Sequence, residues 1–111
     1  MEKITLYEFK SDRIKVRMEI YFNDKEQLIF DGYDVGKAVK ELKESYDYEY
    51  YYTIEMKEVQ KIALLLKVPS EDKASILKAI KANFSGNDAY SKFGDFMRVG
   101  NINFETFTWR G

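Results

Sequence analysis

The sequence contains no histidine, no cysteine and only one proline. Histidine is the side chain that most often serves as a general base near neutral pH, so its absence excludes Ser-His-Asp, Cys-His and His-metal sites. The absence of cysteine excludes disulfides, thiol nucleophiles and cysteine-ligated zinc or iron–sulfur centres. We therefore predict no catalytic residues, no metal ion and no cofactor, and the lack of disulfides fits the reducing cytoplasm.

Long apolar runs and an excess of charge of either sign are also missing. The longest apolar run, Ile62 to Leu66, is far shorter than the ~20 residues that span a bilayer, and the amino terminus lacks the pattern of a signal peptide. Eighteen basic and nineteen acidic residues give a net charge of −1, which removes the basic field expected of a protein that binds duplex nucleic acid. We expect a cytoplasmic protein that binds neither a membrane nor duplex nucleic acid.

Side chains that can form a core are plentiful. Of the 111 residues, 45% are hydrophobic, and nine tyrosines and eight phenylalanines account for most of the aromatic share of 16%. This length and this composition are typical of a single folded domain, which we place over residues 1–111.

Two different hydrophobic periods alternate along the chain. A period of two predicts strands over residues 3–10, 14–22, 27–30, 46–56 and 102–109. Apolar stripes at helical spacing predict helices over residues 35–42, 59–66, 74–84 and 90–97. The order β-β-β-α-β-α-α-α-β is typical of an α+β fold, in which an antiparallel or mixed sheet of about five strands has helices packed on one face.

Local turn and cap signals set the expected boundaries of these elements. Ser11-Asp12 predicts a hairpin between the first two strands, and Asp31-Gly32 predicts a turn that ends the third strand, because glycine adopts positive φ without a steric clash. We expect Asp34 and Ser70 to cap the first and third helices, and Pro69 to stop the second helix.

Residues 45–53 crowd five tyrosines and two acidic residues into one predicted strand. The even-numbered side chains from Tyr46 to Tyr52 share a face with Ile54 and Met56, and we expect that face to belong to the core. The opposite face carries Asp47, Glu49, Tyr51 and Glu55. Because tyrosine offers a large, rigid contact area with a polar tip, this opposite face is a predicted binding site for a protein, and its acids would match a basic partner.

Basic side chains on the second strand leave two alternatives open. Arg13, Lys15 and Arg17 share the polar face of that strand. They could form cross-strand pairs with Asp47, Glu49 and Glu55, or they could form a small basic patch that binds an acidic peptide.

The last predicted strand carries aromatic side chains on both of its faces. Phe107 and Trp109 share one side, and Phe104 lies on the other. Either both faces are covered or one is available to a partner, so we add Phe107 and Trp109 to the predicted partner-binding residues. A terminal edge strand can also pair with the same strand of a second copy, which makes a homodimer a further alternative.

Four carboxylates offer an alternative to protein binding. Asp31, Asp34, Asp47 and Glu49 could form an oxygen-ligand site for a divalent cation if the helix after Asp34 returned the chain beside the third strand. We favour the plainer interpretation, in which Asp31 belongs to a turn, Asp34 caps a helix, and the other two lie on the solvated face of a strand.

Several short motifs carry a resemblance to a group of bacterial proteins. These motifs are Asp34-x-Gly36, Tyr48-Glu49-Tyr50, Phe84-Ser85-Gly86-Asn87, Ile102-x-Phe104 and Trp109. In this series the chain resembles small uncharacterised bacterial proteins, including predicted immunity proteins of polymorphic toxin systems. The resemblance implies a compact α+β inhibitor that binds one cognate toxin without catalysis. We therefore predict a non-catalytic protein-binding module, of which an immunity-type inhibitor is one form, and the alternative is a small-ligand or oxygen-ligand metal-binding domain.

Overall fold

Five strands form one antiparallel sheet in the computed structural model, which describes residues 2–110. They are β1 (Ile4–Lys10), β2 (Lys15–Phe22), β3 (Leu28–Val35), β4 (Asp47–Ile54) and β5 (Glu105–Arg110). Each strand pairs with the next one in the chain, so the order in space is β1-β2-β3-β4-β5. The α+β fold and the predicted order of strands and helices are confirmed.

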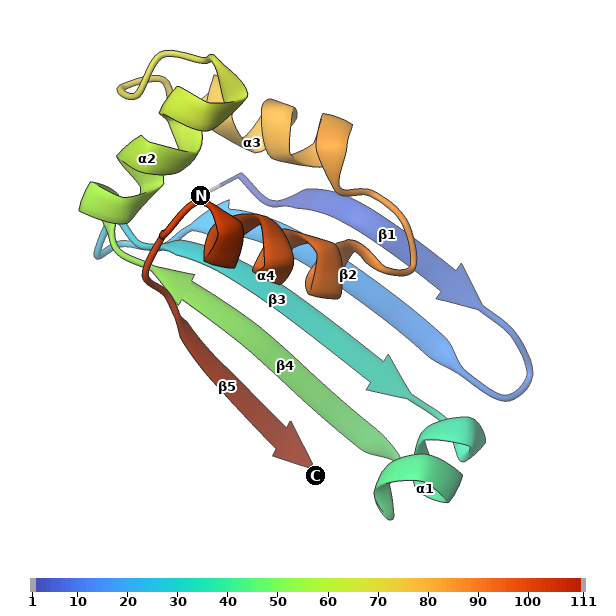
Figure 1. Cartoon of the computed structure of the whole chain (residues 1–111). Helices are drawn as coiled ribbons and strands as arrows, with labels where there is room; N and C mark the ends of the chain where they lie inside the picture. The colour runs from blue at the N-terminus through green and yellow to red at the C-terminus, as the bar shows by residue number, and fades with distance from the viewer. Residues whose placement is uncertain (1, 111) are drawn as a thin grey trace.

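Three of the four helices described lie on one face of this sheet (Figure 1). The three are α2 (Met56–Leu66), α3 (Lys73–Asn83) and α4 (Ala89–Val99), and the short α1 (Lys37–Lys43) joins β3 to β4 at one end of the sheet. None of the elements described for residues 2–110 packs on the other side of the sheet. We call the two sides the covered face and the open face.

Alternation along the strands decides which side chains reach the core. In β2 the residues Val16, Met18, Ile20 and Phe22 are buried, and the side chains between them point to the open face. The register carries this pattern across the sheet, because Ile20 lies opposite Phe30 and Phe30 lies opposite Tyr52. Residues directly opposite each other share a face, so the covered face is mainly apolar from β1 to β4.

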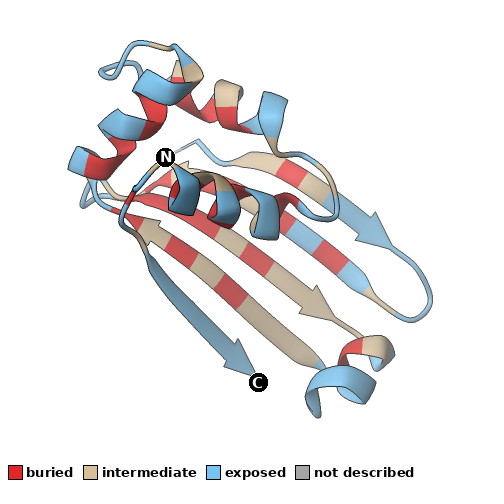
Figure 2. Ribbon diagram, in the orientation of Figure 1, coloured by how far each residue is buried: buried red, intermediate tan, exposed pale blue. Residues whose placement is uncertain are grey.

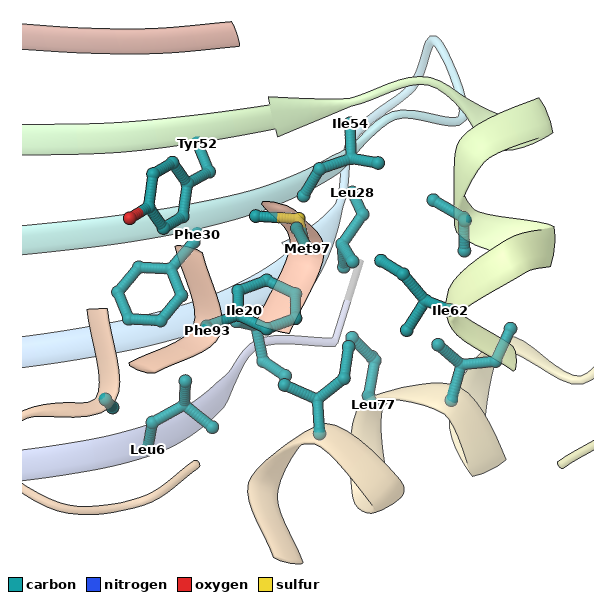
Figure 3. Close-up of a cluster of buried hydrophobic side chains, with 14 of the residues drawn as sticks. Leu6, Ile20, Leu28, Phe30, Tyr52, Ile54, Ile62, Leu77, Phe93 and Met97 are labelled. Carbon is teal, nitrogen blue, oxygen red and sulfur yellow. The ribbon is translucent and has the colours of Figure 1, made fainter. Parts of the chain in front are cut away.

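The core lies between this covered face and the three helices (Figure 3). Phe30, Ile62, Ile80 and Phe93 are fully buried there. Burial of a side chain of this size contributes about 1.5–3 kcal/mol relative to its exposure. Figure 2 shows that the buried residues gather beneath the helices, whereas all of β5 is exposed.

Gly32 does not form the predicted turn, and Asp34 does not cap a helix. Both lie inside β3, which continues to Val35. Gly32 lies opposite Tyr50, and a Cβ at position 32 would overlap the ring of Tyr50. The glycine is therefore needed for the close approach of an aromatic ring and not for a turn. Positive φ occurs instead at Gly36, the N-cap of α1.

Two further boundaries differ from the sequence-based expectation. Asp72 caps α3 in place of Ser70, because its carboxylate accepts hydrogen bonds from the Ser75 amide at 3.0 Å and from the Ser75 hydroxyl at 2.8 Å. Strand β4 ends at Ile54, so Glu55 is the N-cap residue of α2 and does not extend the strand. The predicted end of α2 before Pro69 is confirmed by Lys67, which adopts the left-handed conformation just after the helix.

No helix within residues 2–110 combines the length and the apolar character needed to cross a membrane.

Candidate functional site

Five of the six predicted partner-binding residues lie together on the open face. Asp47, Glu49 and Tyr51 come from β4, and Phe107 and Trp109 come from the neighbouring β5. Tyr51 lies directly opposite Phe107, with ring centroids 6.0 Å apart, and Glu49 lies directly opposite Trp109. The predicted residues of β4 and β5 are 56 to 62 positions apart in the chain, and they form one surface.

Glu55 is the predicted residue that the fold places elsewhere. It lies beyond the end of β4, where its carboxylate accepts a hydrogen bond from the Gln27 amide at 2.6 Å. This bond joins the start of α2 to the turn before β3, so Glu55 has a local structural role apart from the open face.

Strand β3 adds two residues that the sequence prediction missed. Asp31 lies opposite Tyr51, and Tyr33 lies opposite Glu49, so both continue the open face next to β4. Their alternation with Phe30 and Gly32 was the available signal, but Asp31-Gly32 looked like a turn and hid it. We call the combined surface the aromatic–acidic patch, and it consists of Asp31, Tyr33, Asp47, Glu49, Tyr51, Phe107 and Trp109.

Charge is distributed unevenly across the open face. On β3, β4 and β5 the described side chains of this face include the acids Asp31, Asp47, Glu49 and Glu105 but no lysine or arginine. The basic side chains of this face are Lys10, Lys15 and Arg17 on β1 and β2, and Lys3 just before β1, whose ammonium lies over the ring of Tyr21. The patch is therefore acidic, and a more basic strip flanks it on one side.

Tyrosine hydroxyls and carboxylates interact directly within the patch. The Tyr51 hydroxyl donates a hydrogen bond to Glu49 at 2.7 Å. Burial raises the pKa of Tyr51, and the Glu49 carboxylate raises it further, so this hydroxyl stays protonated. Burial also raises the pKa of Asp31, while nearby Arg17 lowers it. A partly desolvated carboxylate such as Asp31 gains stability when a further cation approaches.

The predicted pairing between the basic residues of β2 and the acids of β4 is wrong. Strand β3 lies between β2 and β4, so side chains of these two strands are not cross-strand neighbours. Arg13 forms an ion pair with Glu41 of α1, and Arg17 lies 3.4 Å from Glu19 and over the ring of Tyr33. Among the described residues, the acids of the patch thus form no ion pair with these basic side chains.

The alternative metal site is not formed either. Asp34 points to the covered face, where it accepts a hydrogen bond from the Tyr50 hydroxyl at 2.7 Å. Asp31, Asp47 and Glu49 are on the open face, on the other side of the sheet. Among residues 2–110, no three carboxylates converge on a point where a metal ion could bind. The alternation of side chains along a strand is what separates Asp34 from the other three.

The other tyrosines of β4 belong to the core and its edge, as predicted. Tyr50 and Tyr52 are buried, and Tyr52 stacks on Tyr90 of α4 with ring centroids 4.0 Å apart. The Tyr52 hydroxyl donates a hydrogen bond to the backbone carbonyl of Tyr90 at 2.9 Å. Tyr46 differs, because it precedes β4 and is exposed.

Compared with known proteins, the chain matches no family model, no curated protein and no solved structure. The resemblance to immunity proteins therefore stays a prediction, and the function has to be argued from the site itself.

Proposed function

We propose that this protein is a non-catalytic protein-binding module whose aromatic–acidic patch binds the basic surface of a partner protein. The observation that carries this proposal is the convergence of four aromatic side chains and three carboxylates on a sheet face that no described helix covers. Tyrosine and tryptophan are the side chains that most often dominate the free energy of protein association.

The aromatic side chains supply the apolar part of such an interface. Phe107 is 58% exposed and Trp109 is 48% exposed, and they adjoin Tyr51. A contiguous apolar patch rimmed by polar groups is typical of an interaction site. Hydrogen bonding of β4 to both of its neighbours holds the backbone beneath the patch in place, so little conformational entropy is lost when a partner binds.

The carboxylates supply the specificity. Asp31, Asp47 and Glu49 surround the tyrosine rings, and Asp31 is already partly buried in the free protein. A lysine or arginine from the partner would offset the desolvation of Asp31 and would extend the contact with the rings through cation–π interactions. A basic partner is therefore the class that this surface fits.

An inhibitor of the immunity type is the specific form of this function that the sequence resemblance implies. In that form the partner is one cognate toxin, and the patch would cover the toxin's basic substrate-binding surface. A sheet face suits the stable occlusion of such a surface, because its hydrogen-bonded backbone loses little conformational entropy on binding.

The experiment compares two double variants with the wild-type protein as bait for proteins from its native cell extract. Tyr51→Ala with Trp109→Ala removes two rings from the patch. Leu64→Ala with Val99→Ala is the matched control, because it removes two apolar side chains that are 78% and 86% exposed on the helical side. We expect the patch variant to lose one stoichiometric protein, measured by mass spectrometry, and the control to retain it.

The protein that the wild type and the control variant both capture is then purified. Its affinity for the wild type and for the patch variant is measured at rising salt concentration. Loss of a hot-spot ring typically costs 2 kcal/mol or more, so we expect the patch variant to bind about 30-fold more weakly or worse. We also expect affinity to fall with added salt, since the contact pairs opposite charges. A partner that binds the patch variant and the wild type equally well would refute the proposal.

A further inference from the structure

A cavity of about 400 Å³ opens on the covered face, at the end of the sheet that α2 and α3 do not reach. It lies between α1 and the start of α4, over the strands β2, β3 and β4. Its lining includes Val16 and Met18 from β2, Asp34 from β3, Tyr48 and Tyr50 from β4, and Leu42 from α1. A volume of this size is typical of small-ligand sites.

One carboxylate stands out in this largely apolar lining. Among the described residues that line the cavity, Asp34 is the one acid. The Tyr50 hydroxyl donates to it at 2.7 Å, and within residues 2–110 no cation lies at ion-pair distance from it. Burial raises the pKa of Asp34, while the hydrogen bond from Tyr50 and the nearby charge of Lys43 lower it. A carboxylate that is partly removed from water and has no ion-pair partner attracts a cation.

Aromatic rings flank this carboxylate. The rings of Tyr48 and Tyr50 lie 5.5 Å apart, and those of Tyr50 and Tyr90 lie 4.8 Å apart, measured between centroids. The Lys43 ammonium lies 4.8 Å from the centroid of Tyr48. The protein's own lysine thus shows that an ammonium group is accommodated against these rings.

We propose that this cavity binds a small organic ammonium ion with an apolar body. Its protonated amine pairs with Asp34 beside the tyrosine rings, and its apolar part packs against Val16, Met18 and Leu42. Lys43 competes for the same rings from the rim of the cavity. The site lies on the opposite side of the sheet from the aromatic–acidic patch, so it is a second function that does not rest on the first.

The test measures the binding of three probes to the wild-type protein by isothermal titration calorimetry. The probes are phenethylammonium, its neutral analogue 2-phenylethanol, and the anion 3-phenylpropionate. A hydrogen bond to a charged group contributes about 1.5–3 kcal/mol, so we expect the ammonium probe to bind about 10-fold to 100-fold more tightly than the neutral one. Equal affinity for the neutral probe, or tighter binding of the anion, would overturn the proposal without the need for any variant.

Three variants then locate the site. Asp34→Asn keeps the shape of the side chain, and we expect it to bind phenethylammonium no better than the neutral probe. Glu71→Gln removes the same charge from an exposed position outside the cavity and the patch, and it should leave the affinity unchanged. Lys43→Met removes the competing ammonium and should tighten binding several-fold.

Each variant has an outcome that contradicts the proposal. If Glu71→Gln weakens binding as much as Asp34→Asn does, the probe responds to net charge and not to a site. If Lys43→Met weakens binding, the lysine does not compete for the cavity. We also expect Asp34→Asn to bind the protein partner of the aromatic–acidic patch as tightly as the wild type does. A failure of the cavity proposal can then be told apart from a failure of the proposed function of the patch.

Discussion

Gly32 is the residue whose replacement the structure penalises most directly. It lies in the middle of β3, and the ring of Tyr50 fills the space that a side chain would occupy. We expect Gly32→Ala to lower the free energy of unfolding by about 1–3 kcal/mol, because the ring has to move away from Asp34 and Tyr90 to make room for one methyl group. Urea denaturation followed by circular dichroism measures this change.

Gly86 provides the matched control for that substitution. A Cβ at Gly86 would meet only the carboxylate of Asp88, at 3.0 Å, and that short side chain can turn toward solvent. Gly86→Ala should therefore change the free energy of unfolding by less than about 0.5 kcal/mol. Equal losses of stability in the two variants would mean that the tight contact between Gly32 and Tyr50 is not what makes position 32 intolerant.

At the scale of elements, one buried carboxylate ties α2 to the segment that leads into β5. Glu58 is buried, and its Oε1 accepts hydrogen bonds from the Asn103 amide at 2.8 Å and from the Lys61 ammonium at 2.9 Å. The Asn103 bond and then the Lys61 bond lower the pKa of Glu58 in the folded state. The stabilisation is thus fully present above the unfolded pKa, which is about 4.3, and is lost as the pH falls through the lower folded value.

We therefore expect Glu58→Gln to melt below the wild type at pH 7, with a difference in Tm that shrinks as the pH falls below about 4. Glu71→Gln is the control, because Glu71 is exposed in the turn before α3. Thermal melts at pH 7, pH 5 and pH 3 measure this difference in Tm. A Tm difference that stays constant or widens toward low pH would show that the carboxylate of Glu58 is not the charged acceptor described above.

Sequence periodicity predicted the elements of this fold well, because burial on one side of a strand or helix leaves a repeating apolar signal. It failed where tertiary contacts replace local rules. Gly32 and Asp34 are residue types typical of a turn and of a helix cap, but contacts with the Tyr50 ring and hydroxyl hold both inside a strand.

The candidate site was predictable only in part. Asp47, Glu49 and Tyr51 share a face of β4 in any register, since alternate residues always do. The same holds for Phe107 and Trp109 on β5. These β4 and β5 residues form one patch only because β5 lies next to β4. The alternation of side chains along a strand does not reveal which strands are neighbours.

At the scale of the whole molecule, the two edge strands of the sheet differ in how readily a further strand can pair with them. One edge strand, β1, carries a bulge between Thr5 and Tyr7, and a bulge discourages pairing with another strand. The other edge strand, β5, has no bulge or proline within its described residues, and all six of them are exposed. Strand β5 is therefore the edge at which a partner, or a second copy of the chain, can add a strand.

Hydrogen exchange followed by mass spectrometry tests this asymmetry. Strand β5 has one neighbour and no helix above it, so we expect its amides to exchange faster than those of β3, which lies between two strands under the helices. Exchange in β4 and β5 should slow when a partner occupies the aromatic–acidic patch. Slower exchange in β5 at high protein concentration alone would instead indicate pairing of two copies through this edge. If β5 in the dilute, free protein were as protected as β3, the edge would be closed by contacts within the chain, and neither mode of strand addition would be open to it.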